Sequence, residues 1–122
     1  MLFDTRYFWA VFTSKDRPTT EKLRDLFVKS KSPCTSSVTI YEVFKLTLAN
    51  EGKDVAKLRV GTIKRDFEIV SVDSDVAEEG AEISHRLRVP MADALIMSTS
   101  KRLRLPCVTD DPHFSEVKTV WI

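Results

Sequence analysis

Short apolar segments alternate with longer segments of helical periodicity along the chain, and this alternation constrains the fold more than any other feature of the sequence. Neighbouring parallel strands need a crossover of about ten residues or more between them, whereas antiparallel neighbours can be joined by a tight turn. The sequence therefore predicts an α/β fold, a three-layer α/β/α sandwich around a mainly parallel central sheet of about four or five strands.

The predicted elements follow one another in a regular order. Strands are expected at residues 1–3, 34–38, 67–70, 105–109 and 117–122. Helical periodicity covers residues 7–12, 19–31, 39–50, 53–65, 73–87 and 91–102, and a brief helical segment is expected after the turn at 110–112. The helices at 39–50 and 53–65 are interpreted as a helical hairpin. Gly80 lies on the apolar face of its helix, which indicates close packing against a neighbour.

Composition predicts one small globular domain spanning residues 1–122. The 19 basic and 18 acidic residues nearly cancel, so any nucleic-acid binding must come from local patches. No apolar run approaches the roughly 20 residues of a membrane span, and the N-terminus has no basic leader. We therefore expect a cytoplasmic protein with no membrane contact. Cys34 and Cys107 are expected to be buried free thiols, because they lack the spacing of a zinc site.

Several acidic residues fall at the same kind of position in this scheme. Asp93 lies in the first turn of an otherwise apolar helical segment at 90–97, where a charge needs a compensating partner. Asp4, Glu42 and the pair at 110–111 also fall just after a predicted strand or early in a helix. Because the carboxyl ends of parallel strands meet at one edge of a sheet, where ligands bind, we expect these side chains to lie together.

Two interpretations of these acids remain open. Carboxylate oxygens are the natural ligands of Mg²⁺ and Mn²⁺, and such a cation lowers the pKa of a water and neutralises a phosphodiester oxygen. Taken singly, each acid also fits a helix cap or a helix dipole: Thr39 and Glu42 match a capping box, and the Asp-Pro pair at 111–112 matches an N-cap. Capping does not account for the apolar surroundings of Asp4 and Asp93.

The order of these motifs resembles the PIN domain family, in particular the small VapC-type toxins of toxin–antitoxin pairs. The resemblance rests on residues 2–5, Glu42, residues 92–96 and residues 108–111, and it covers essentially the whole chain. It implies a divalent-metal-dependent endoribonuclease that hydrolyses RNA phosphodiesters by metal-activated water, with Mg²⁺ or Mn²⁺ as cofactor and a cognate antitoxin protein as partner. The implied catalytic residues are Asp4, Glu42, Asp93 and Asp111, of which Asp4, Asp93 and Asp111 hold the metal, with Thr5, Thr109 and Asp110 in support.

Some residues depart from the pattern of the family. Arg6 stands where the family often has a small polar residue, and together with Lys45 it is a candidate phosphate contact. Asp110 stands where a basic or small residue is common, so either Asp110 or Asp111 could face the metal, and motif position favours Asp111. His113 replaces what is frequently another acid, and it is interpreted as a cap or surface residue rather than a catalytic base.

Other functions compete with the ribonuclease hypothesis. The alternative is a catalytically silent PIN-like binding module, whose acidic pocket receives a basic side chain from a partner protein. A receiver-like phosphoacceptor domain would share the sheet and the acidic pocket, but the order of motifs and the mid-chain Glu42 fit it poorly. No glycine-rich phosphate loop is present, which argues against a nucleotide-binding enzyme. The apolar faces of the first helix and of the helical hairpin together predict a homodimer.

Overall fold

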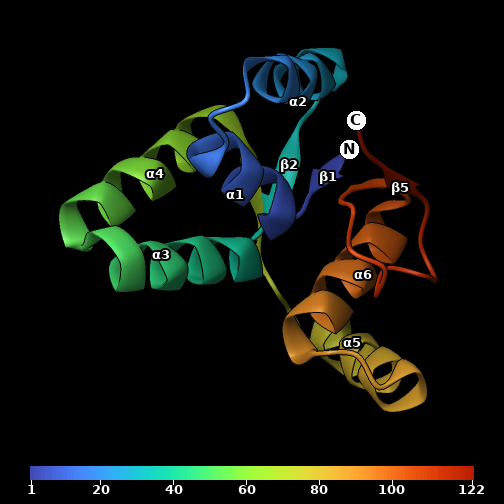
Figure 1. The fold of residues 1–122 in the computed structure, drawn as a ribbon. Helices are drawn as coiled ribbons and strands as arrows, with labels where there is room; N and C mark the ends of the chain where they lie inside the picture. Colours follow the sequence, from blue (N-terminus) through green and yellow to red (C-terminus); the bar gives the residue numbers. More distant parts are fainter.

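The computed structural model describes residues 1–122, which form six helices and five strands (Figure 1). The strands are β1 (Leu2–Phe3), β2 (Cys34–Ser36), β3 (Glu68–Val70), β4 (Cys107–Val108) and β5 (Thr119–Val120). The helices are α1 (Thr5–Thr13), α2 (Arg17–Lys29), α3 (Ser37–Glu51), α4 (Lys53–Asp66), α5 (Ser74–Leu87) and α6 (Met91–Leu103). A pair of helices follows each of the first three strands, as the alternation in the sequence predicts.

All neighbouring strands of the sheet are parallel, in the order β3-β2-β1-β4-β5. β1 is the central strand, in which Leu2 lies opposite Cys34 of β2 and opposite Cys107 of β4. The chain builds the sheet outward from β1 through β2 and β3, and then returns to add β4 on the other side of β1. Ligands of open parallel sheets bind where the strand order reverses in this way, which here is the gap after β1 and β4.

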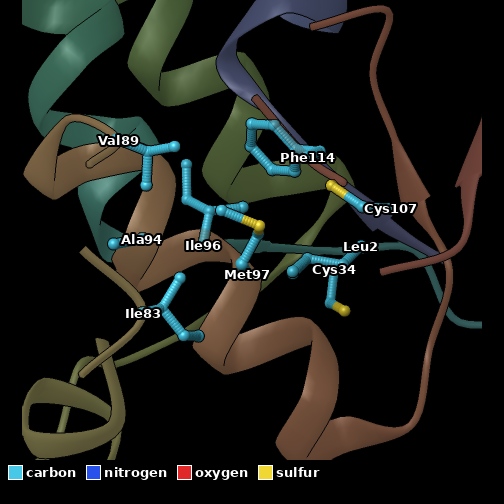
Figure 2. Close-up of a cluster of buried hydrophobic side chains, with 9 residues drawn as sticks. All are labelled: Leu2, Cys34, Ile83, Val89, Ala94, Ile96, Met97, Cys107 and Phe114. Atoms are coloured by element: carbon cyan, nitrogen blue, oxygen red, sulfur yellow. The ribbon is translucent and has the colours of Figure 1, made fainter. Parts of the chain in front are cut away.

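The sheet separates two apolar cores, because successive residues of a strand point to opposite faces. Phe3 and Val108 belong to a core that includes side chains of α1, α2, α3 and α4, whereas Leu2 and Cys107 belong to a core shared with α5 and α6. Figure 1 shows α1, α3 and α4 on one side of the strands and α5 and α6 on the other. The second core is shown in Figure 2. The predicted three-layer arrangement is confirmed.

The expected boundary between β2 and the next helix is wrong. β2 ends at Ser36, whose hydroxyl accepts a hydrogen bond from the Val38 N–H at 3.1 Å and so caps α3. Because α3 begins at Ser37 instead of Thr39, Thr39 and Glu42 do not form the predicted capping box. Their side chains are left free for contacts with other elements at the edge of the sheet.

The predicted brief helix after residues 110–112 is also wrong, because residues 110–116 form turns and irregular backbone. The Asp111 carboxylate accepts a hydrogen bond from the backbone N–H of His113 at 2.9 Å, and the Asp111 carbonyl accepts one from the N–H of Phe114 at 3.2 Å. These bonds close a tight turn, a conformation that a short Asp side chain stabilises. The last strand, β5, is correspondingly shorter than predicted.

Close packing between α5 and α6 confirms the expectation for Gly80. A Cβ atom at Gly80 would lie 2.8 Å from Cδ2 of Leu95 in α6. A residue larger than glycine would therefore force the Leu95 side chain to move, because the backbone of α6 lies at 3.4 Å or more from that Cβ position.

Two further expectations concern cysteines and membranes. Cys34 and Cys107 are buried free thiols, as predicted. None of the six helices has both the length and the apolar character of a membrane span.

Candidate active site

The predicted acidic residues come from four segments that the topology brings to one edge of the sheet. Asp4 directly follows β1, and residues 110–111 follow the neighbouring strand β4. Glu42 lies in α3, which begins directly after β2, and Asp93 lies in the first turn of α6. β2, β1 and β4 run parallel, so their carboxyl ends meet. The acids therefore gather at the point where the strand order reverses.

Asp4 is the most buried of these acids, with an exposed fraction of 2%. Its Oδ2 accepts a hydrogen bond from the Thr109 hydroxyl at 2.8 Å, and the same hydroxyl accepts one from the Asp111 N–H at 3.1 Å. Asp4 occupies the N-cap position of α1 but makes no capping hydrogen bond, so the capping interpretation is wrong for this residue. Thr109 instead links Asp4 to the segment that carries Asp111.

Thr5 positions Glu42 at the same edge. The Thr5 hydroxyl donates a hydrogen bond to Glu42 Oε1 at 2.6 Å and lies 3.3 Å from the buried hydroxyl of Thr39. Thr5 is the first residue of α1, so this bond connects the starts of α1 and α3. Both threonines predicted to support the site, Thr5 and Thr109, thus contact one of its acids.

Asp93, Asp111 and His113 form the tightest group of potential metal ligands. His113 Nδ1 lies 3.1 Å from Asp93 Oδ2 and 3.0 Å from Asp111 Oδ1. One donor atom from each residue falls within 4.8 Å of the other two. The side chains of Asp93 and Asp111 are 16% and 13% exposed, whereas that of His113 is 50% exposed. The two carboxylates are sheltered, and the imidazole stands on their solvent side.

The adjacent residue Asp110 lies outside this group. Its Oδ1 forms an ion pair with Arg6 Nε at 2.9 Å, and both side chains are substantially exposed. Asp111, rather than Asp110, therefore joins the donor cluster. The second candidate phosphate contact, Lys45, lies with its ammonium group 5.7 Å from the centre of the Tyr41 ring on the exposed side of α3.

Burial and mutual repulsion raise the pKa of two of these acids. Burial raises the pKa of Asp4 to about 7, and the charges of Glu42 and Asp93 add to the effect. Burial likewise raises the pKa of Asp93 to about 6, and the charge of Asp111 is the next largest cause. Like charges held this close favour protonation or a cation between them. The edge of the sheet therefore carries negative charge that the chain does not fully neutralise.

The residues at this edge fit a hard divalent cation. Mg²⁺ and Mn²⁺ prefer carboxylate oxygens and keep several waters, so a few protein ligands on an open surface suffice. Asp93 and Asp111 supply such oxygens within 4.8 Å of each other and are open to solvent on one side. A cation here would also relieve the repulsion that raises the pKa of Asp93.

A model of the PIN domain matches residues 1–120. The chain belongs to the PIN domain family. Nucleases of the PIN domain family generally use divalent metals. Among curated proteins, no sequence matches this PIN domain.

Solved structures share the PIN fold over almost the whole chain at low sequence identity. DNA-bound VapBC from Salmonella typhimurium matches with a TM-score of 0.82 and 18% identity, covering 98% of this chain and 96% of that chain. VapC20 from Mycobacterium tuberculosis, a toxin that cleaves the sarcin–ricin loop, matches with a TM-score of 0.79 and 18% identity, covering 94% and 92%. FitAcB from Neisseria gonorrhoeae matches with a TM-score of 0.77 and 22% identity, covering 97% and 94%.

Sequence reasoning on this PIN domain missed the contacts of His113. The residue is exposed, as expected, but its imidazole contacts both Asp93 and Asp111. The contact depends on the turn that the Asp111 carboxylate stabilises, in a segment where the sequence pattern predicted a helix. The only signal in the sequence is the spacing of two residues between Asp111 and His113, which is common in loops without any such contact.

Proposed function

We propose that this PIN domain is a divalent-metal-dependent endoribonuclease and the toxin component of a toxin–antitoxin pair. The observation that carries the proposal is the convergence of two sheltered carboxylates, Asp93 and Asp111, whose donor atoms lie within 4.8 Å of each other at the carboxyl edge of a parallel sheet. Asp4, which Thr109 links to Asp111, completes the set of acids. Membership of the PIN domain family supports the same chemistry.

In this proposal three of the acids bind a cation and the fourth accepts a proton. Asp4, Asp93 and Asp111 hold the cation. When bound, a divalent cation lowers the pKa of a water molecule and neutralises charge on a phosphodiester oxygen. We assign the role of proton acceptor to Glu42, because the Thr5 hydroxyl holds its Oε1 while its Oε2 has no hydrogen-bond partner in the chain. Glu42 is also only partly buried, so that Oε2 can be reached by water and substrate.

RNA is the proposed substrate. An acidic centre repels a polyanion, so binding needs cations around it, and exposed Arg6 and Lys45 are our candidates for phosphate contacts. Arg6 is held at the rim by its ion pair with Asp110 and would exchange that partner for a phosphate. The fold similarity to VapC20, a toxin that cleaves the sarcin–ricin loop, supports RNA over DNA as the substrate.

Two protein partners complete the proposal. Similar solved structures include toxin–antitoxin complexes from Klebsiella pneumoniae and Salmonella typhimurium, which supports a cognate antitoxin. We also propose a homodimer, because the hairpin of α3 and α4 exposes apolar side chains that a monomer leaves in water. The exposed fraction is 71% for Leu58 and 42% for both Leu46 and Leu48.

Cleavage of a labelled RNA under single-turnover conditions tests the proposed function. Wild-type protein is incubated with MnCl₂, with MgCl₂ or with EDTA, next to Asp93→Asn and the control Asp25→Asn, which removes an exposed acid from α2. We expect cleavage only with a divalent metal, a loss of about a hundredfold in Asp93→Asn, and full activity in Asp25→Asn.

Cleavage in EDTA, or full activity of Asp93→Asn, would refute the mechanism. If the protein neither cleaves RNA nor binds metal but co-purifies with a small protein that has a basic tail, the silent binding module is correct instead. The acidic pocket would then receive a Lys or Arg side chain in place of the cation.

A further inference from the structure

The imidazole of His113 is held against the two sheltered carboxylates by the chain itself. The backbone N–H of His113 donates a hydrogen bond to Asp111 Oδ1 at 2.9 Å, which fixes the residue beside that carboxylate. The next residue, Phe114, is 2% exposed and belongs to the core that α6 helps to build (Figure 2). His113 is therefore held by its own backbone hydrogen bond and by the buried residue that follows it.

The Nδ1 atom of His113 lies within hydrogen-bond distance of two carboxylate oxygens at once. Nδ1 lies 3.1 Å from Asp93 Oδ2 and 3.0 Å from Asp111 Oδ1, yet a ring nitrogen carries at most one hydrogen. One of the two contacts must therefore be a shared or secondary hydrogen bond. In the other neutral tautomer the nitrogen lone pair faces two carboxylate oxygens, an arrangement that a proton on one carboxylate or a cation between the three groups stabilises.

Two of the three spacings among the donor atoms match the edges of a metal coordination shell. Adjacent ligands of an octahedral cation with bonds of about 2.1 Å lie about 3 Å apart. The distances from Nδ1 to the two carboxylate oxygens have this value, and all three atoms fall within 4.8 Å of one another. If the Asp93 and Asp111 oxygens approach to the same spacing, the three atoms form one face of the coordination shell of a single cation.

We propose that His113 Nδ1 is a direct ligand of the divalent cation, together with Asp93 and Asp111. This inference rests on the cation site of the proposed function. It changes the chemistry of that site, because one nitrogen joins the oxygen donors. Imidazole is a good ligand for first-row transition metals and a poor one for Mg²⁺, which prefers oxygen. The site therefore selects a transition-metal ion such as Mn²⁺ over Mg²⁺.

Pulsed electron paramagnetic resonance of bound Mn²⁺ tests the ligand directly, because a coordinated imidazole nitrogen modulates the spin echo. The chain has only two histidines, so His85→Gln, an exposed change on α5, is a matched control for His113→Gln. We expect nitrogen modulation in wild type and His85→Gln and its loss in His113→Gln. Circular dichroism checks that both variants fold.

Competition between metals provides the second measurement. MgCl₂ is titrated against protein-bound Mn²⁺, and we expect His113→Gln to release Mn²⁺ at a Mg²⁺ concentration lower by about tenfold than wild type. Bound Mn²⁺ without nitrogen modulation, or equal competition in wild type and His113→Gln, would overturn the inference and leave the proposed function standing. Absence of any bound Mn²⁺ would overturn both, and His113 would then be a hydrogen-bonded neighbour of the acids.

Discussion

Replacing Asp4 by Asn is expected to stabilise this protein while removing a residue of its proposed active site. The Asp4 side chain is 2% exposed, and burial together with neighbouring negative charges raises its pKa from 3.8 to about 7. The folded chain therefore binds the proton of Asp4 more tightly than the unfolded chain. Between about pH 4 and pH 7 the folded state holds more protons, so the free energy of unfolding falls as the pH rises through this interval.

The size of the effect follows from the same pKa values. One proton difference changes the free energy of unfolding by about 1.4 kcal/mol per pH unit, and the folded-state pKa of about 7 sets the upper limit of the interval. From pH 5 to pH 7 this amounts to at most roughly 3 kcal/mol, and relaxation around a buried charge reduces it to about 2 kcal/mol. Asn cannot ionise, and its amide oxygen can still accept the hydrogen bond from Thr109.

Urea denaturation at pH 5 and pH 8 in EDTA measures this effect. We expect the stability of Asp4→Asn relative to wild type to be greater at pH 8 than at pH 5 by about 2 kcal/mol. The control Asp25→Asn, an exposed position on α2, should show no such dependence. The reasoning is refuted if the difference between Asp4→Asn and wild type is the same at both pH values, or if it is smaller at pH 8.

Three further outcomes are expected. At a MnCl₂ concentration of about 100 times Kd, calorimetry should show the wild-type protein stabilised by about 2.7 kcal/mol relative to the protein in EDTA. Most of this gain should be absent in Asp93→Asn. Equal gains in the two proteins would contradict a metal site at Asp93. Gly80→Ala should destabilise the fold by about 1 kcal/mol in urea denaturation, because the added Cβ would lie 2.8 Å from the Leu95 side chain. Gly61→Ala, whose added Cβ would meet no neighbouring atom within 4 Å, should instead stabilise the fold by up to about 1 kcal/mol. The reverse order of the two stabilities would contradict the packing argument. Thr5→Val should slow RNA cleavage about tenfold without changing the affinity for Mn²⁺, because it frees Glu42; an unchanged rate would remove Thr5 from the mechanism.

The general plan of the sheet was predictable because it depends on long-range patterns. Helical segments between apolar segments require parallel crossovers, and the parallel pairing then fixes where Asp4 and Asp111 lie relative to each other. The apolar surroundings of Asp93 were visible in its own helix. These features do not depend on the details of any turn.

Local geometry was harder to predict because several residues competed for the same hydrogen bonds. Ser36 caps α3 in place of Thr39, which leaves Thr39 facing Thr5 across the edge of the sheet. The separation of Asp110 from Asp111 depends on the ion pair of Asp110 with Arg6, which lies 104 residues away in the sequence. Sequence patterns contain neither of these tertiary contacts.

Anomalous diffraction at the manganese edge, from crystals of wild-type protein soaked in MnCl₂, tests the central claim most directly. We predict one anomalous peak at the edge of the sheet, about 2.1 Å from carboxylate oxygens of Asp93 and Asp111. The claim that these acids converge on a divalent cation would be contradicted by the absence of a peak in crystals whose packing leaves this edge of the sheet accessible. A peak bound only by residues other than Asp93 and Asp111 would contradict it as well.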